Sequence, residues 1–264
     1  MKYVLVTGAC GGMGKATVGA LKNQGYFVIA LDKFIPDKTE ENILYIQADV
    51  TSEESLNNAF NEVKKTTSSL FAIVHFAGLY LLDSLIEIDE KAFTKAFDVN
   101  VFGAFRVNKT FFPLLTKGSR IIITTSELAP LAPLPFTGLY AVTKSTLDKY
   151  AYSLRMEVQL LGMYVSVLRP GAIKTDMLNV STDALDKFCT QTKLYDCNAV
   201  RFKKIVNSVE AKNVTTDKIA KKTLKILSAR KPKQVYNLNR NFLLRLLNVL
   251  PKSMQTFIIK KILK

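Results

Sequence analysis

Two side chains in the middle of the chain could together exchange a proton. Tyr140 and Lys144 are four residues apart, so on a helix they lie one turn apart on the same face. A phenol has a pKa of about 10 in water, too high for a base at neutral pH. A neighbouring ammonium group favours the phenolate and should lower that pKa. Tyrosine and lysine meet at this spacing on many helices, so the pair needs support from other residues.

A hydroxyl group upstream of this pair could bind the oxygen of a substrate. Ser126 lies 14 residues before Tyr140 and ends the β-branched run that starts at Arg120. Sites in open α/β sheets gather where the strands end. A hydroxyl there can donate a hydrogen bond to a carbonyl oxygen and so orient the reacting carbon. Strand alternation puts Thr124 on the same side, but the terminal position favours Ser126.

A glycine-rich segment near the N-terminus predicts a dinucleotide site. Residues 7–14, Thr-Gly-Ala-Cys-Gly-Gly-Met-Gly, follow a strand-like run and open a helical stretch. One glycine makes a tight turn, another lets the backbone approach a pyrophosphate, and the helix N-terminus offers free N–H groups. Loops often contain glycine for other reasons. The prediction therefore depends on the position of this segment at the first strand–helix junction.

Asp32 indicates which dinucleotide is bound. It closes the second strand-like run, 18 residues after Gly14. A carboxylate at this place accepts hydrogen bonds from the adenosine ribose and repels a 2′-phosphate, so we expect NAD rather than NADP. A capping or turn aspartate is the alternative, and the nearby Lys33 and Lys38 could tolerate a phosphate.

Alternating strand-like and helical stretches must position these groups. Continuous apolar runs are typical of strands covered on both faces. The alternation predicts an α/β fold, a doubly wound parallel sheet of Rossmann type, as a single domain with a C-terminal helical extension. The expected strands are Tyr3–Val6, Phe27–Leu31, Leu44–Ala48, Ala72–Phe76, Arg120–Thr125, Val165–Leu168 and Lys233–Tyr236. The expected helices are Met13–Asn23, Glu53–Thr66, Glu90–Leu115, Leu139–Leu161 and Thr215–Ser228.

The charge divides the chain into a neutral body and a basic end. Residues 1–200 hold 20 Lys+Arg and 20 Asp+Glu, whereas residues 201–264 hold 17 and 2, so the net charge of +15 belongs to the last quarter. We expect a nucleotide-binding catalytic domain over residues 1–238. Within it, residues 174–213 have no clean period and are expected to form a lid over the substrate.

The tail, residues 239–264, alternates apolar and basic side chains, and Pro251 should break it into two short helices. Helices of this kind can contact an anionic membrane surface. The alternative is an extension that covers the substrate pocket or contacts another subunit, with its basic residues simply solvated. We do not expect nucleic acid, because the tail has few aromatic residues and no reader motif.

The composition excludes several classes of protein. With 48% hydrophobic and 22% charged residues, the chain is neither disordered nor collagen-like. The three cysteines and one histidine give no zinc-ligand spacing and no disulfide framework, so no metal is expected. The strand-like start leaves no room for a signal peptide, and no run of about 18 apolar residues could span a bilayer. We therefore expect a cytoplasmic protein that meets membranes only at their surface.

Taken in order, these motifs resemble the short-chain dehydrogenase/reductase family over about residues 2–230. The segment 7–14 is similar to its cofactor fingerprint, and Ser126 followed by Tyr140-x-x-x-Lys144 is similar to its catalytic residues. The resemblance implies hydride transfer between a nicotinamide cofactor and a secondary alcohol or ketone. Tyr140 would be the general acid in reduction and the base in oxidation, Lys144 would also hold the nicotinamide ribose, and Asn100 would hold a water of the proton relay. For Asn100, the alternative is a polar residue that bonds helix backbone.

The resemblance also implies the residues that bind the cofactor. Asp49-Val50 is similar to the pair that contacts adenine. His75-Phe76 stand where the family usually has two asparagines, and we expect His75 to be a core or cofactor-wall histidine rather than a base. The expected cofactor-binding residues are Gly8, Gly12, Met13, Gly14, Asp32, Asp49, Val50, Ala77, Gly78, Tyr140, Lys144, Pro170, Gly171, Ile173 and Thr175.

Apolar stretches near the expected site predict a pocket for a small lipophilic alcohol or ketone. They are residues 79–82, 127–139 and 177–178, and ordinary loop packing is an equal alternative. The tail is similar to the hydroxysteroid (17β) and retinol dehydrogenase branch, which implies a substrate such as a hydroxysteroid. The resemblance further implies a homodimer or homotetramer built on the helices near 90–115 and 139–161. The alternatives are a catalytically silent NAD-bound sensor or scaffold, and an epimerase or dehydratase that uses the same Tyr–Lys pair.

Overall fold

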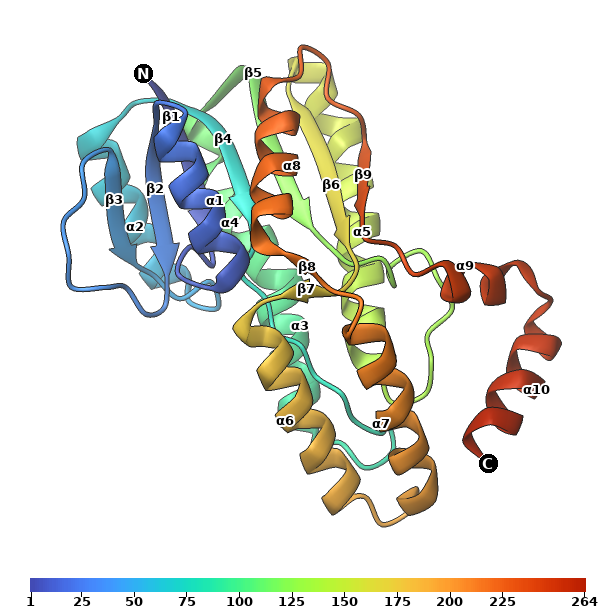
Figure 1. The fold of residues 1–264 in the computed structure, drawn as a ribbon. Helices are drawn as coiled ribbons and strands as arrows, with labels where there is room; N and C mark the ends of the chain where they lie inside the picture. Colours follow the sequence, from blue (N-terminus) through green and yellow to red (C-terminus); the bar gives the residue numbers. More distant parts are fainter.

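A seven-stranded parallel sheet forms the centre of the computed structural model, with strand order β3-β2-β1-β4-β5-β6-β9 (Figure 1). The structure describes the backbone of residues 1–264 and every side chain except those of residues 176–183 and 209–210. The strands are β1 (Lys2–Thr7), β2 (Tyr26–Asp32), β3 (Ile43–Gln47), β4 (Leu70–His75), β5 (Leu115–Thr124), β6 (Tyr164–Pro170) and β9 (Val235–Leu238). The predicted doubly wound parallel sheet is confirmed.

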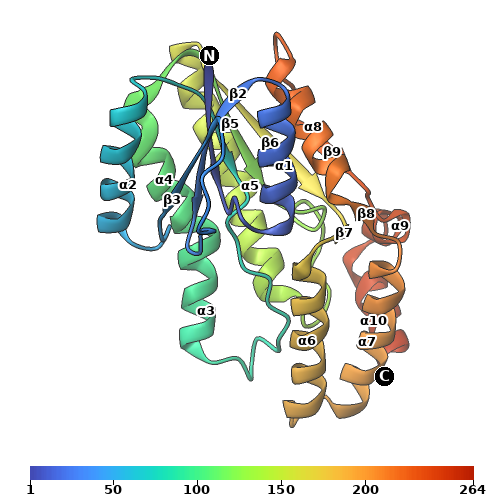
Figure 2. The same ribbon diagram turned by 60° about the vertical axis from the view of Figure 1, so that its left-hand side comes forward.

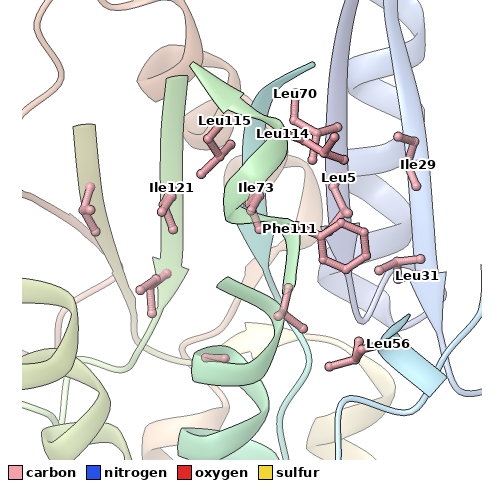
Figure 3. Packing of buried hydrophobic residues seen from close by; sticks show 14 of the residues in the cluster. Leu5, Ile29, Leu31, Leu56, Leu70, Ile73, Phe111, Leu114, Leu115 and Ile121 are labelled. Carbon is pink, nitrogen blue, oxygen red and sulfur yellow. The ribbon is translucent and has the colours of Figure 1, made fainter. Parts of the chain in front are cut away.

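Helices cover both faces of the sheet because its strands are apolar on both sides (Figure 2). Helices α1 (Gly12–Asn23) and α8 (Thr216–Ser228) pack on one face, against side chains such as Val4 and Val6. Helices α2 (Glu53–Thr66), α4 (Gly103–Phe111) and α5 (Gly138–Val158) pack on the other. Figure 3 shows this second core, where Phe111 of α4 lies beside Leu5 and Leu31 of the sheet.

The strand order reverses between β1 and β4, and this reversal creates a crevice at the carboxyl ends of the strands. β1 and β4 pair in register from Val4 with Ala72 to Thr7 with His75. The loops that follow these two strands therefore leave the sheet side by side. Gly8 lies so close to Ala77 that a Cβ on Gly8 would clash with the Ala77 backbone nitrogen, and its φ of +64° is one that favours glycine.

The long helix expected over residues 90–115 is interrupted. It consists of α3 (Glu90–Phe97), a π-helical turn (Asp98–Phe102), α4 and a 3₁₀ turn (Phe112–Leu114). Helical turns of π type are rare and frequently mark functional sites. The hydrophobic period could not predict the π turn, because a single turn barely changes which side chains face the sheet.

Two helices and a two-stranded ribbon occupy the region without a clean period. The ribbon pairs β7 (Ile173–Lys174) with β8 (Val214–Thr215), and between them run α6 (Asp176–Gln191) and α7 (Asp196–Glu210). Both helices project beyond the carboxyl ends of the sheet strands (Figure 1). The tail forms α9 (Phe242–Val249) and α10 (Lys252–Leu263), with the expected break at Pro251. Among the described residues, no helix combines the length and the apolar character needed to cross a bilayer.

Candidate active site

A cavity of about 190 Å³ lies beyond the carboxyl ends of the central strands. One side is formed by the loops that follow β4, β5 and β6, and the other by α7 and α9 of the lid and tail. Its surface is mostly apolar, with a few polar side chains at one end, a composition typical of sites for small organic molecules. The polar side chains that line it are Tyr80, Thr124, Thr125, Ser126, Glu127, Thr137, Tyr140, Lys144 and Thr175.

Tyr140 and Lys144 lie at the N-terminal end of α5 and both line this cavity. The Lys144 Nζ atom is 5.7 Å from the centre of the Tyr140 ring and donates a hydrogen bond to the backbone carbonyl of Thr124 at 3.3 Å. An ammonium group has three donors. No other hydrogen bond of Lys144 is found among the described residues, so two donors remain for a bound molecule.

Burial dominates the protonation of both groups. It raises the pKa of Tyr140 to about 12, and a hydrogen bond with Ser126 only partly offsets the rise. Burial also lowers the pKa of Lys144 to about 8. The Tyr140 pKa therefore lies above its ordinary value and not below it as predicted, because removal of the phenol from water has the largest effect. At neutral pH, Tyr140 is a phenol that can donate a proton.

The hydroxyl groups of Thr124, Thr125 and Ser126, at and just after the end of β5, have different surroundings. Ser126 lies two residues beyond the end of β5 rather than ending the strand as expected, and its Oγ accepts a hydrogen bond from the Leu128 backbone at 3.2 Å. The Thr125 hydroxyl donates to Asp148, which is paired with Arg169. Thr124 Oγ1 is buried and has no partner among the described residues.

Asn100 sits within the π-helical turn and ties it to the loop after β4. Its side chain accepts a hydrogen bond from the Leu79 N–H at 2.7 Å and donates to the Leu79 carbonyl at 3.0 Å. It also donates to the Thr143 hydroxyl on α5 at 3.1 Å. Asn100 therefore links this loop to the helix that carries Tyr140. The backbone that it bonds belongs to the loop and not to a helix, as the alternative had it. Its expected role in a proton relay stays a prediction.

The glycine-rich turn has the shape of a phosphate cradle. A Cβ on Gly14 would run into the Gly8 carbonyl and come within 2.8 Å of the Ala9 Cα atom. A Cβ on Gly12 would lie 2.8 Å from Thr175, so glycine also lets the β7 loop approach. Helix α1 starts here with no side-chain cap and no acidic residue in its first turn, which leaves its N–H groups available to an anion. This turn fits the pyrophosphate of a dinucleotide.

Asp32 faces the glycine-rich turn from the end of β2. Its carboxylate accepts hydrogen bonds from the backbone N–H of Cys10 at 2.9 Å and of Phe34 at 3.3 Å. The lysines that could have tolerated a phosphate here are engaged elsewhere. Lys33 pairs with Asp49 at 2.7 Å, and Lys38 pairs with Glu40.

Of the remaining expected cofactor residues, Asp49, Val50 and Ala77 are not among those that line the cavity, whereas the others are. Partial burial raises the pKa of Asp49, but hydrogen bonds from Lys33 and Thr51 outweigh it and lower the pKa to about 2. Val50 packs against Gly103 at the start of α4, and Ala77 packs against Gly8 of the glycine-rich turn. The expected residues that line the cavity itself are Met13, Gly78, Tyr140, Lys144, Pro170, Gly171, Ile173 and Thr175.

His75 is a core residue. It is buried in β4, and its Nε2 atom lies 2.9 Å from Asn108 Oδ1. Because Asn108 Nδ2 donates to the Tyr150 hydroxyl, the Oδ1 atom is the acceptor and His75 Nε2 carries the proton. Burial lowers the pKa of His75 to about 4, and the bond to Asn108 only partly opposes this. It is not among the residues that line the cavity.

Several contacts of the site were not predicted from the sequence, although Glu127 itself lies in the stretch 127–139 that was expected to line the pocket. Glu127, next to Ser126, is buried against the cavity, and burial raises its pKa. Its Oε2 atom accepts a hydrogen bond from the Asn241 N–H at 2.6 Å and so joins the site to the tail. No local pattern could show this contact, because 114 residues separate the partners. The apolar residues missed are Phe202, Ile205 and Val206 of α7 and Leu244 of α9.

An aromatic cluster joins α6 and α7 to the loop that precedes α5. The Phe136 ring lies 4.6 Å from that of Phe188, 5.2 Å from that of Tyr195 and 5.3 Å from that of Phe202. Phe136 has a φ of +64°, which is unfavourable for this residue type, so its ring contacts must offset the cost. The expected pocket stretches 79–82 and 127–139 do contribute to the cavity, whereas the side chains of 177–178 lie outside the described residues.

Comparison with known proteins agrees with this geometry. The family model described as short chain dehydrogenase matches residues 2–186. Estradiol 17-beta-dehydrogenase 2 of Mus musculus is 34% identical over 197 residues, covering 70% of this chain and 51% of that protein. The chain thus spans about half the length of this relative.

Two further relatives match most of their own length. The 3-amino-tetrahydro-pyrrolizinone reductase of Xenorhabdus hominickii is 30% identical over 249 residues, covering 89% of this chain and 86% of that protein. The crystal structure of a short chain dehydrogenase family protein from Francisella tularensis superposes with a TM-score of 0.75 at 23% identity. It covers 90% of this chain and 97% of the other.

Proposed function

Because this chain belongs to the short-chain dehydrogenase family, we propose that it interconverts a secondary alcohol and a ketone by hydride transfer with NAD. The observation that carries the proposal is the cavity itself. It places the Tyr140 phenol, the Lys144 ammonium and the Ser126 hydroxyl together, beside a turn shaped for a dinucleotide. When bound, the nicotinamide would supply the acceptor or donor of the hydride.

In this proposal Tyr140 moves the proton. With its pKa raised to about 12, the phenol is protonated at neutral pH and can donate to the oxygen of a ketone as that oxygen gains charge. In the opposite direction a phenolate would have to take the alcohol proton.

Lys144 and Ser126 assist from two sides. The cationic Lys144 stabilises negative charge on Tyr140 after proton loss, and its free donors suit the hydroxyls of a ribose. Ser126, hydrogen-bonded to Tyr140, can donate to the same substrate oxygen and so hold the carbonyl in line for reaction.

The far side of the cavity supports a lipophilic substrate. Phe202, Ile205, Val206 and Leu244 line it, and Tyr80 stands with its ring 4.6 Å from that of Tyr140. A ketone on an apolar skeleton would bury that skeleton here while its oxygen meets the polar end. We propose a hydroxysteroid or a compound of similar character, in keeping with the estradiol named in the mouse relative.

NAD is the proposed cofactor in preference to NADP. Asp32 holds its carboxylate at the glycine-rich turn, and the neighbouring cations are paired with Asp49 and Glu40. A 2′-phosphate at this place would meet the negative charge of Asp32. Measured kcat/KM values should favour NAD, and a strong preference for NADP would overturn the assignment.

The chemistry is tested by following NADH at 340 nm with a panel of steroids, bile acids, retinol and short hydroxy acids. Tyr140→Phe should remove at least about 99% of turnover while NAD still binds, since only the proton donor is lost. Tyr152→Phe, an exposed position on the same helix, is the matched control and should behave as wild type.

Three outcomes would contradict the proposal. Wild-type turnover by Tyr140→Phe would remove the assigned role of the phenol. Binding of NAD without turnover on any substrate of the panel would favour a silent sensor or scaffold instead. Substrate conversion without net NADH change would favour an epimerase or dehydratase.

We further propose that the protein forms a homodimer or homotetramer through α4 and α5. The exposed apolar side chains of α4, of the π-helical turn before it and of α5 include Phe102, Phe105, Val142 and Met156. Large apolar side chains grouped on an exposed face are typical of surfaces that contact another chain.

A further inference from the structure

The tail helices α9 and α10 are fixed to the body of the protein by one face. Leu244 lines the cavity, and the Asn248 side chain accepts a hydrogen bond from the Ala132 N–H at 2.6 Å. The Leu263 carbonyl accepts a hydrogen bond from Asn198 of α7 at 2.6 Å, and the Leu263 side chain is buried. The opposite face of the tail is therefore held in a defined orientation.

That opposite face is apolar and exposed. Phe242, Leu246 and Val249 follow one another at intervals of four and three residues, so they form a single stripe along α9. Phe242 is 70% exposed and Val249 is 81% exposed. Large apolar side chains that gather on one exposed face indicate a surface that contacts something. The exposed apolar side chains of the two helices are Phe242, Leu243, Leu246, Val249, Met254, Phe257 and Ile262.

The charges around this face have one sign. Residues 239–264 contain six basic side chains and no acidic one. Five of these are exposed, whereas Arg240 is half-buried near Glu127. An apolar stripe among exposed cations is the pattern of helices that lie in the headgroup region of an anionic membrane. A second copy of the tail would bring like charges together with no carboxylate to pair them. The basic residues are Arg240, Arg245, Lys252, Lys260, Lys261 and Lys264.

We propose that the outer face of α9 and α10 docks on an anionic lipid membrane. Leu244 lines the cavity from the inner face of α9, so docking would place the cavity within the width of one helix, about 10 Å, of the lipid. A lipophilic substrate could then pass from the membrane to the site with little exposure to water. This last step rests on the proposed function, whereas the docking itself does not.

The test is flotation of the full chain with vesicles, either of phosphatidylcholine alone or with about a third phosphatidylserine. The chain should float with the anionic vesicles and stay behind with the neutral ones. F242S/V249S and, separately, R245Q/K260Q/K261Q should each lower the lipid-bound fraction relative to free protein by about tenfold or more.

Matched control variants test whether lipid binding depends on this surface or on exposed apolar and basic side chains anywhere on the protein. L160S/L161S removes two exposed leucines at the end of α5, 84% and 55% exposed. K218Q/K221Q/K225Q removes three exposed lysines of α8. Both controls should float as wild type does, and NAD binding by all variants checks that they are folded.

Three results would overturn the proposal. They are failure of the wild-type chain to float with anionic vesicles, equal flotation of wild type and the tail variants, and equal losses in the tail and control variants. Flotation without turnover on any substrate would contradict the proposed function and leave the docking surface intact. Turnover without flotation would contradict the docking surface and leave the proposed function intact.

Discussion

His75 shows how surroundings fix the state of a single side chain. The only histidine of the chain invited assignment as a base, but it is buried, neutral and hydrogen-bonded to Asn108. The same burial keeps Tyr140 protonated and reduces the pKa of Lys144. The positions of all three could be predicted from the sequence. Their protonation could not, because it depends on water excluded by residues far along the chain.

His75 should make the fold sensitive to acid. Its pKa is about 4 in the folded protein against 6.5 for the ordinary group. The unfolded chain therefore binds a proton first, and stability falls as the pH drops from 6.5 to 4, by about 3 kcal/mol in full. His75→Gln keeps a donor at the position of Nε2 without a titrating group. Urea unfolding of the variant should depend less on pH in this window, and parallel curves would contradict the prediction.

Gly14 should tolerate no side chain. In Gly14→Ala the new Cβ would meet backbone atoms of Gly8 and Ala9, which cannot rotate away, so the turn must shift. We expect NAD affinity measured by calorimetry to fall at least about tenfold, since the N–H groups of the turn would no longer converge. Gly19→Ala in the same helix is the control. Nothing lies within 4 Å of its Cβ, so this variant should bind normally and gain up to about 1 kcal/mol of stability. Normal binding by Gly14→Ala would exclude the cradle.

At the scale of elements, the features predicted correctly from the sequence are those that a regular hydrophobic period or a local motif encodes. The sheet, most of its helices and the break at Pro251 follow from such patterns. The π turn around Asn100 and the lid helices α6 and α7 do not. Residues of these two helices, such as Leu185 and Phe202, pack against Leu82 and Leu263 from different elements. No single face of either helix therefore gives a clear hydrophobic period in the sequence.

The outer faces of α4 and α5 should mediate self-association. F102E/F105E places two charges on an exposed apolar surface that we expect to be buried between copies, where unpaired charge is costly. Light scattering should report a dimer or tetramer for the wild type and a monomer for the variant. L194E, at an exposed leucine between α6 and α7, should keep the wild-type mass. A monomeric wild-type protein at about 10 μM would contradict the expectation.

At the scale of the whole molecule, Glu127 connects chemistry, sheet and tail. It follows Ser126, its N–H bonds Pro170 at the end of β6, and its carboxylate receives the N–H at the start of α9. The expected boundary at residue 238 left open whether the tail covers the substrate pocket. In the structure its first helix helps to line the cavity, so the substrate site depends on residues of the tail.

Loss of the Glu127 carboxylate should therefore act on substrate binding. Glu127→Ala would leave the Asn241 N–H without its acceptor and cost about 1–2 kcal/mol of stability. We expect KM for the best substrate of the panel to rise severalfold with little change in kcat, because Leu244 moves while Tyr140 does not. Glu127→Gln retains an acceptor oxygen and should restore most of the binding. A fall in kcat at constant KM would instead indicate a direct chemical role.

Early and late parts of the sequence contribute different walls of the cavity, and this has a practical consequence for engineering. The reacting side chains come from residues up to 144, whereas α7 and α9 contribute part of the apolar wall. Recombinant hybrids that exchange everything after Lys174 for the equivalent stretch of another member of the family could therefore inherit a new selectivity while retaining the catalytic machinery. The Glu127–Asn241 bond marks the junction such hybrids would need to preserve.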